Sequence, residues 1–518
     1  MILLFYRIIA NVSVIIIGDT GCGKSSLFIK LNKLLNNNQA KVEIINIHSG
    51  INNEQLCQIM KEKNEKAQEI KDTELWLFFD EINTCLSLTL ITEIFTNKSY
   101  NGNKLNDNIR LIGACRPYLF KTDKNEDNDN NKLKYLVQPL TQSLLYYAFN
   151  FGSINENAEK NYIYKIIQKL FTKEEKDLQE NTKEVISQCQ IYMRQNFDSS
   201  FVSLRDIIRF TKLVLFFEDY FVKKNNYEKK INNENNNKIK SIICSIYICY
   251  YIKFKNDILR TNFDIVIRPY ILNLINNEKT NGGNICLIEN IKNEEFKKEI
   301  KENEEINKFV DILISEENFL INQIELDKGI SKNTILKENI FLLFVSIMTQ
   351  IPLIMIGKSG SGKSLSVQLI IKSMKGKYSS NNFFKLFPKI ITTHFQGTNT
   401  CKENDIENIF IKAQEKLDYY NNNKTNIESP ISIIIFEQID LAEKSDNNPF
   451  EILNTKFDYY QNKEELISFI GISNYSLDAA TMNRGLILYV QNLYEKYNEL
   501  IISSYNIAAS ISSRIKKD

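Results

Sequence analysis

The sequence predicts an α/β protein with two parallel sheets in tandem, each flanked by helices, and an α-helical lid between them. One observation is a repeated glycine-rich motif, GDTGCGKS from Gly18 and GKSGSGKS from Gly357, whose copies lie 339 residues apart. A second is the recurring order of apolar run, glycine-rich turn, helix and apolar run, which is typical of βαβ units. Between the copies, apolar residues recur at three- and four-residue spacing, which indicates helices.

Composition places the 518-residue chain among globular proteins, with 43% hydrophobic and 25% charged residues. The 65 basic and 63 acidic side chains leave a formal charge of +2, so no basic field indicates nucleic acid or an anionic membrane. Nine cysteines without a CxxC pair, and only two histidines, exclude an encoded zinc finger or RING. Free thiols fit a reducing compartment, and we expect a cytoplasmic protein.

Four regions are expected along the chain. Too few residues follow the second sheet region for a complete second lid, so the chain is either a fragment or its second module packs against another chain. The regions are a first P-loop subdomain (1–135), a helical lid and linker (136–337), a second P-loop subdomain (338–500) and the start of a truncated second lid (501–518).

Some segments resemble targeting or membrane sequences. The apolar run 1–17 is expected to be a strand rather than a signal peptide, because Arg7 and Asn11 interrupt it and a phosphate loop follows directly. The run 241–252 is shorter than the roughly 20 residues that span a bilayer, so we expect a buried helix and no transmembrane segment. Stretches rich in Asn, Lys and acids are expected to be flexible surface insertions: 121–134, 223–240 and 421–426.

Both glycine-rich motifs satisfy GxxxxGK[ST], follow an apolar strand and precede a helix, as a phosphate loop requires. Lys24 and Lys363 would reach the β and γ phosphates, and Ser25 and Ser364 would coordinate Mg²⁺. The implied cofactors are therefore ATP and Mg²⁺. Backbone N–H groups would cradle phosphate at a helix N-terminus because the turns are built from Gly18, Gly21, Gly23, Gly357, Gly360 and Gly362.

In the first module, ELWLFFDEIN is an apolar strand that ends in two acids, the Walker B arrangement. Asp80 would hold Mg²⁺ through water, and Glu81 would polarise the attacking water as general base. The next apolar run ends at Arg116, 36 residues after Asp80, where AAA+ modules usually carry a sensor 1 asparagine. Arg116 could bind phosphate, pair with Glu81, or be an ordinary surface arginine.

In the second module, the corresponding positions are Glu437 and Gln438, and the next strand ends at Asn474, 37 residues after Glu437. Gln438 would contact nucleotide but cannot accept a proton, and losing a positioned base costs about 10²- to 10⁴-fold in rate. The longer Glu437 would also displace the metal-binding carboxylate by roughly an ångström. A shifted register would instead make Glu437 the base and put Phe436 at the metal position. Either arrangement predicts a site that binds ATP and hydrolyses it poorly.

Two further arginines are candidate catalytic residues. Arg484, in MNRGL, lies where AAA+ modules place an arginine finger that reaches the neighbouring nucleotide, which here would be the first site. Arg205, in VSLRDIIRF, fits a sensor 2 arginine that touches the γ-phosphate. For Arg484, a helix-capping or surface role is the alternative.

Two strings, VQPLTQSLLYYAFNFGSI and FIGISNYSLDAATMNRG, are more specific than any phosphate loop because phosphate binding does not require them. With GDTGCGKS, DEIN and GACRPY, they resemble the mysterin family of giant AAA+ E3 ubiquitin ligases, over roughly 12–220 and 338–490. The resemblance implies a dynein-like core of successive AAA+ modules, two with working nucleotide sites, and ubiquitin transfer elsewhere in a longer protein. Arg116, Glu437 and Gln438 depart from the AAA+ pattern.

Three functions remain open. The first is an ATPase in which the first site hydrolyses and the second mainly binds ATP. The second is a scaffold that binds ATP without hydrolysis. The third, a nucleic-acid translocase, predicts a basic or aromatic groove that the balanced charge does not provide. Expected partners are ATP, further AAA+ modules or copies of this chain, and ubiquitin machinery only through a longer parent protein; no nucleic acid is expected.

Overall fold

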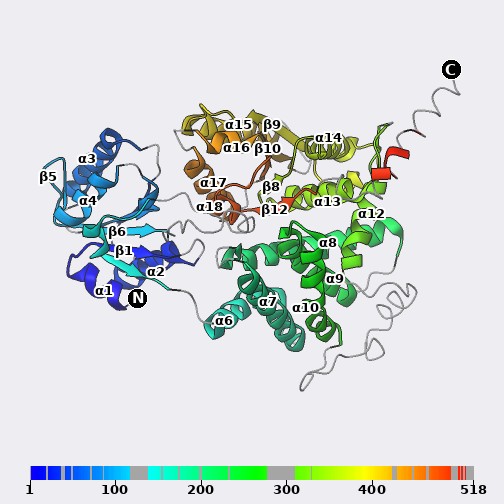
Figure 1. The fold of residues 1–518 in the computed structure, drawn as a ribbon, viewed down its shortest axis with the longest axis horizontal. Helices are drawn as coiled ribbons and strands as arrows, with labels where there is room; N and C mark the ends of the chain where they lie inside the picture. The colour runs from blue at the N-terminus through cyan, green and yellow to red at the C-terminus, as the bar shows by residue number, and fades with distance from the viewer. Residues whose placement is uncertain are drawn as a thin grey trace.

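Two five-stranded parallel sheets with the same strand order, connected by a group of helices, form the computed structural model (Figure 1). The strand orders are β2-β3-β6-β1-β7 and β9-β10-β11-β8-β12, so corresponding strands occupy corresponding places. This confirms the predicted tandem α/β architecture. The structure describes residues 2–18, 22–36, 41–47, 51–70, 73–85, 87–116, 138–152, 156–172, 175–197, 201–230, 234–276, 310–327, 329–422, 429–445, 449–462, 466–491, 500, 501, 503–505 and 508.

The first module begins with a helix, which corrects the expectation of a strand over residues 1–17. Leu4 and Ile8, four residues apart, lie on one helical face and are buried in a small core beside β1. Asn11 has a positive φ of 53°, and the strand starts only at Val14. The elements are α1 (Ile2–Ile9), β1 (Val14–Ile17), α2 (Lys24–Asn36), β2 (Lys41–Asn46), α3 (Asn53–Glu69), β3 (Leu75–Asp80), α4 (Leu88–Asn97), β4 (Ser99–Tyr100), β5 (Asn103–Lys104), β6 (Ile109–Cys115), α5 (Gln142–Leu145) and β7 (Ala148–Asn150).

The region between the sheets is helical, as expected. The run 241–252 lies largely in α9 and is buried, which confirms the buried-helix prediction. The stretch 223–240 is mostly helical rather than an insertion, because α8 continues to Glu228 and α9 begins at Glu234. The stretch 121–134 and most of 421–426 lie outside the described residues. The helices are α6 (Glu156–Ile167), α7 (Lys176–Asn196), α8 (Leu204–Glu228), α9 (Glu234–Cys249), α10 (Asp257–Asn276), α12 (Val310–Asn322) and α13 (Thr334–Thr349).

One expected region boundary falls inside a helix, and another separates a strand from the sheet to which it belongs. The boundary at 337 lies within α13, which leads directly into β8. The boundary at 135 separates β7 from the first module, although β7 pairs with β1 in the first sheet. The second module comprises β8 (Leu353–Ile356), α14 (Lys363–Ser373), β9 (Ile390–Gln396), α15 (Glu403–Asn422), β10 (Ile431–Glu437), α16 (Ile439–Glu443), α17 (Phe450–Asn462), β11 (Ile467–Ser473), α18 (Ala479–Met482) and β12 (Leu486–Tyr489).

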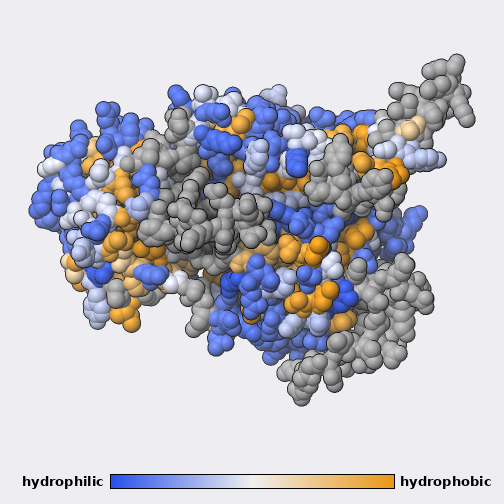
Figure 2. All heavy atoms as spheres, in the orientation of Figure 1, coloured by the Kyte–Doolittle hydropathy of each residue, from blue (hydrophilic) through white to orange (hydrophobic). Residues whose placement is uncertain are grey.

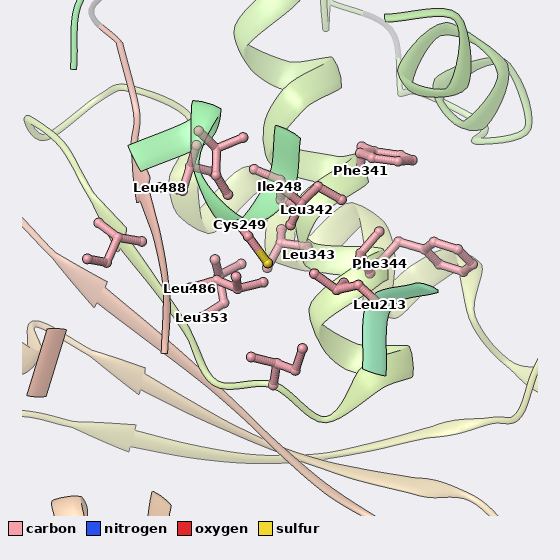
Figure 3. Close-up of a cluster of buried hydrophobic side chains, with 14 of the residues drawn as sticks. Leu213, Ile248, Cys249, Phe341, Leu342, Leu343, Phe344, Leu353, Leu486 and Leu488 are labelled. Atoms are coloured by element: carbon pink, nitrogen blue, oxygen red, sulfur yellow. The ribbon is translucent and has the colours of Figure 1, made fainter. Parts of the chain in front are cut away.

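The helical region and the second sheet share one hydrophobic core, whereas the first module has separate cores. Figure 3 shows side chains from both parts in contact range of one another. They include Leu213 of α8, Cys249 of α9, Phe344 of α13, Leu353 of β8 and Leu488 of β12, each 0% exposed. Such interiors are close-packed and have low compressibility, so a movement of one packed element moves its neighbours as well. The helices therefore form one body with the second module.

The surface is mixed. Figure 2 shows hydrophilic side chains over α7 and apolar side chains gathered at the edge of the first module near α1, where Ile2 and Ile9 are exposed. In the described part of the chain, no helix combines the length and the apolar character needed to cross a bilayer.

Gly397, directly after β9, approaches the backbone of the strand end beside it. Its N–H donates to the Glu437 carbonyl at 2.8 Å, and an added Cβ would lie 2.3 Å from the Gln438 carbonyl oxygen. We expect Gly397→Ala to lower the free energy of unfolding by about 1–3 kcal/mol, because rigid backbone must move. Gly471→Ala is the matched control, since its Cβ would meet only side-chain atoms, the nearest at 3.2 Å. Urea unfolding of both variants checks this, and equal losses would contradict it.

Candidate functional site

The first phosphate loop joins β1 to α2 at the carboxyl end of the sheet. Gly23 has a φ of 93°, a conformation that favours glycine, and an added Cβ on Gly18 would lie 3.1 Å from the Cys22 sulfur. The Lys24 Nζ donates to the Gly18 carbonyl at 2.6 Å. The Lys24 ammonium thus lies against the start of the loop. Gly21, also predicted to bind phosphate, lies outside the described residues.

The Walker B acids stand beside this loop. The Ser25 hydroxyl donates to an Asp80 carboxylate oxygen at 3.4 Å, so the two groups predicted to hold Mg²⁺ are neighbours. Hydroxyl and carboxylate oxygens are the ligands that magnesium prefers, and this pair fits such an ion. Glu81 follows β3 with a left-handed φ of 58° and is 5% exposed. This backbone turns the Glu81 side chain away from the line of the strand.

Arg116 is buried rather than on the surface, with 4% of the residue exposed. Asn83 fixes its backbone from both sides: Arg116 N–H donates to Asn83 Oδ1 at 3.1 Å, and Asn83 Nδ2 donates to the Arg116 carbonyl at 2.9 Å. Its guanidinium donates through Nη2 to Glu81 and through Nη1 to Asp478 of the second module, the latter at 3.0 Å. Of the alternatives for Arg116, pairing with Glu81 is the arrangement observed.

Arg484 reaches the first site from the second module. Its Nη2 lies 3.6 Å from Glu81 Oε1, and its Nε donates to Asp458 on α17 at 3.0 Å. Arg205, at the start of α8, donates to the same Asp458 carboxylate at 3.1 Å. Four of the predicted first-site residues, Glu81, Arg116, Arg484 and Arg205, therefore belong to one charge network at the junction of the modules.

The charges of this network act on one another. Burial raises the pKa of Asp80, and the Glu81 carboxylate raises it further, while Lys24, Arg484 and Arg116 oppose the shift. Burial and the neighbouring Arg484 guanidinium lower the pKa of Arg205 to about 10, against the attraction of Asp458. The Asp458 carboxylate, which accepts hydrogen bonds from both Arg205 and Arg484, is the anion that lies between these two cations.

The second phosphate loop joins β8 to α14 as the first joins β1 to α2. Gly360 and Gly362 have φ values of 83° and 85°, and a Cβ on Gly357 would lie 2.9 Å from the Val490 carbonyl oxygen. The Lys363 ammonium donates to the carbonyls of Gly357 and Lys358, the latter at 2.9 Å. Ser364 is exposed at the start of α14.

The structure gives the two Walker B regions matching geometry. Gln438 follows β10 with a φ of 51°, as Glu81 follows β3 with 58°. Asn474 N–H donates to Asp440 Oδ1 at 3.3 Å, as Arg116 N–H donates to Asn83. This correspondence favours the register that aligns Glu437 with Asp80 and Gln438 with Glu81. The Gln438 side-chain oxygen accepts a hydrogen bond from Gln396 at 2.5 Å.

Residues that the sequence interpretation missed are those that hold the arginines. Asp458 and Asp478 bind Arg484, Arg205 and Arg116, yet no motif marks them as site residues. Arg209 of α8 is a further member, since it donates to the Asn483 carbonyl beside Arg484. The only sequence signal was the specificity of the string LDAATMNRG, which contains Asp478 and Arg484.

Glu443 lies behind Asp478 and accepts a hydrogen bond from its N–H at 2.6 Å. Burial raises the pKa of Glu443 from 4.5 to about 7; the Asp478 N–H opposes the shift, and the charges of Asp478 and Asp440 add to it. The folded protein therefore binds more protons than the unfolded chain between about pH 4.5 and 7. The stability that protonated Glu443 contributes is full below that window and is lost as the pH rises through about 7.

We expect Glu443→Gln to remove this dependence, because the amide oxygen still accepts the Asp478 N–H but carries no charge. The free energy of unfolding of the variant, relative to the original, should rise by on the order of 2 kcal/mol from pH 4.5 to 8. Urea unfolding across this range measures it. Parallel stability curves for the two proteins would contradict the assignment.

Comparisons with known proteins agree with this geometry. Two family models, each described as RNF213 AAA domain, match residues 1–119 and 329–497. The chain is 28% identical to the E3 ubiquitin-protein ligase rnf213-beta of Danio rerio, over 98% of this chain and 10% of that protein. It is 26% and 25% identical to the E3 ubiquitin-protein ligases RNF213 of Homo sapiens and Mus musculus, over 97% of this chain and 10% of each of them.

The chain thus spans about a tenth of the length of these relatives. The two model matches cover both sheet regions except β7, and the relatives align through the helices between them as well. AAA domains are nucleotide-binding domains in general, which agrees with both phosphate loops. The chain belongs to the RNF213 family, the mysterin family that its motifs resemble, and carries two of the family's AAA domains.

Proposed function

We propose that this chain is an ATPase in which the first site hydrolyses ATP and the second mainly binds it. The observation that carries the proposal is the convergence of Glu81, Arg116 and Arg484 beside the first phosphate loop, with Arg484 supplied by the second module. A hydrolytic site needs a base and cations for the phosphate charge, and these residues supply both.

Each residue has a proposed role. Lys24 and the loop glycines hold the phosphates, and Ser25 and Asp80 hold Mg²⁺, which when bound neutralises charge on the phosphates. Glu81 orients the attacking water and accepts its proton. Arg484 and Arg205 face the γ-phosphate, and Arg484 does so as an arginine finger across the module junction. For this, the arginines must leave Glu81 and Asp458, with which they pair here.

The second site keeps its phosphate loop but has an amide where the first has its base. Gln438 cannot take a proton, and its side chain is held by Gln396. Asn474 retains the sensor 1 position, and Lys363, Ser364 and Glu437 retain nucleotide and metal contacts in this proposal. The second module would then hold ATP as a structural ligand and keep the Arg484 loop in place.

The relatives' names support a wider role. Because they are E3 ubiquitin-protein ligases, we propose that this chain acts as an ATP-driven part of such a ligase, in the cytoplasm, beside further AAA+ modules or copies of itself. A scaffold without turnover is the main competing function, and the first experiment separates the two.

We expect Glu81→Gln to lower steady-state phosphate release by about 10²- to 10⁴-fold, because an amide cannot act as the base. The matched control is Gln438→Ala in the second site, which should keep most of the rate. A coupled phosphate-release assay on the purified chain measures both. If the original protein and Glu81→Gln release phosphate at equal rates, the scaffold function is correct instead.

We expect Arg484→Ala to lower the rate about 10³-fold or more, as in other NTPases that lose an arginine finger. Arg110→Ala is a suitable control, because Arg110 lies on β6 of the first sheet and pairs with Glu74, away from the loop. ADP affinity should change little, since ADP lacks the γ-phosphate. An unchanged rate in Arg484→Ala would rule out the cross-module role.

A further inference from the structure

One carboxylate at the first site belongs to a residue of the second module. Asp478 comes from the second module, yet its Oδ2 accepts a hydrogen bond from Arg116 Nη1 at 3.0 Å, and both side chains are below 10% exposed. The other arm of the same guanidinium, Nη2, donates to Glu81. Arg116 is thus shared between the proposed base of the first site and an acid of the second module.

Asp478 is itself held rigidly. Its Oδ2 accepts the Ala480 N–H at 3.0 Å at the start of α18, and its N–H donates to Glu443 at 2.6 Å. The short segment that follows ends in Arg484, whose Nη1 donates to the Ala480 carbonyl at 3.1 Å. Asp478 and Arg484 therefore approach the Glu81 carboxylate as parts of one small unit, the first through Arg116 and the second directly.

The charges of this arrangement matter for catalysis. The Glu81 carboxylate is held between two guanidinium groups, those of Arg116 and Arg484. If Asp478 were neutral, a larger share of the attraction of buried Arg116 would fall on Glu81, because the Arg116 guanidinium is shared between these two carboxylates. Because Asp478 also accepts a hydrogen bond from Arg116, the guanidinium does not pair with Glu81 alone.

We propose that Asp478 is a positioning residue of the first site: it competes with Glu81 for the Arg116 guanidinium and so keeps Arg116 available to the γ-phosphate. This rests on the proposed hydrolysis at the first site and adds that the second module completes it with an acid as well as with Arg484. Asp478 touches neither nucleotide nor water in this role and acts only through Arg116.

The test is a double-mutant cycle with Asp478→Asn and Arg116→Asn in the full chain, with the turnover of the Glu81→Gln protein subtracted so that only the first site is measured. Asparagine at 478 still caps α18 but loses the charge. With Arg116 present, Asp478→Asn should lower kcat about 5- to 10-fold and lower the preference for a non-hydrolysable ATP analogue over ADP by a similar factor. ADP affinity should stay nearly unchanged, which a merely structural role would not allow.

With Arg116→Asn, the same change at Asp478 should have less than a twofold effect. Equal effects in both backgrounds, or no effect in either, would overturn the proposal. If the chain shows no turnover that depends on Glu81, the proposed hydrolysis has failed, and the cycle is then decided by the preference for the ATP analogue over ADP alone. Coupling between the two positions in that preference supports the positioning role, and additivity overturns it.

Discussion

The shared core between the helical region and the second sheet is the constraint on which the first site depends. Because α8, α9 and α13 pack against β8 and β12, the second module and the helices behave as one body. That body carries Arg205 on α8 and Arg484 after α18, and both bind the Asp458 carboxylate. The second module and the helices therefore determine the distance between the two arginines, whereas the first module contributes the phosphate loop and the acids.

The junction between the modules is made of charges rather than of apolar surface at this point. Glu81, Arg116 and Asp478 form a chain of alternating sign, and each is largely removed from water. Buried ion pairs of this kind add little stability, because desolvation offsets the attraction, but losing one partner leaves a costly unpaired charge. Such a junction fixes the relative position of the two modules more than it stabilises their association. A triphosphate, as a polyanion, would compete with Glu81 and Asp478 for the arginine side chains.

The sequence sufficed for the fold because its signals are local. The phosphate loops, the apolar strands and the spacing of 36 and 37 residues between paired positions predicted both sheets and matched Arg116 with Asn474. Residues 2–9 were misjudged as strand because a short apolar run has no clear period, and the burial of Leu4 and Ile8 appears only in three dimensions. The stretch 223–240 has the composition of an insertion, but α8 continues into it from an amphipathic segment upstream and ends only at Glu228.

The candidate site was predictable only in part, for a physical reason. Lys24, Asp80 and Glu81 belong to motifs whose spacing follows from one strand and one loop, so a linear pattern encodes them. Asp458 and Asp478 bind arginines that lie hundreds of residues earlier in the sequence. The residues around an isolated aspartate on a helix or loop do not indicate such a distant partner.

The structure also changes the meaning of Arg116. In the sequence, Arg116 occupies the position where AAA+ modules usually carry a sensor 1 asparagine, and its contacts cannot be derived from that position alone. In the folded protein, Asn83 fixes its backbone as Asp440 does for Asn474, so the position is intact and only the side chain differs. An arginine there is long enough to reach the second module, which an asparagine is not. Arg116 therefore keeps a contact within the first site, to Glu81, and adds a link to the second module through Asp478.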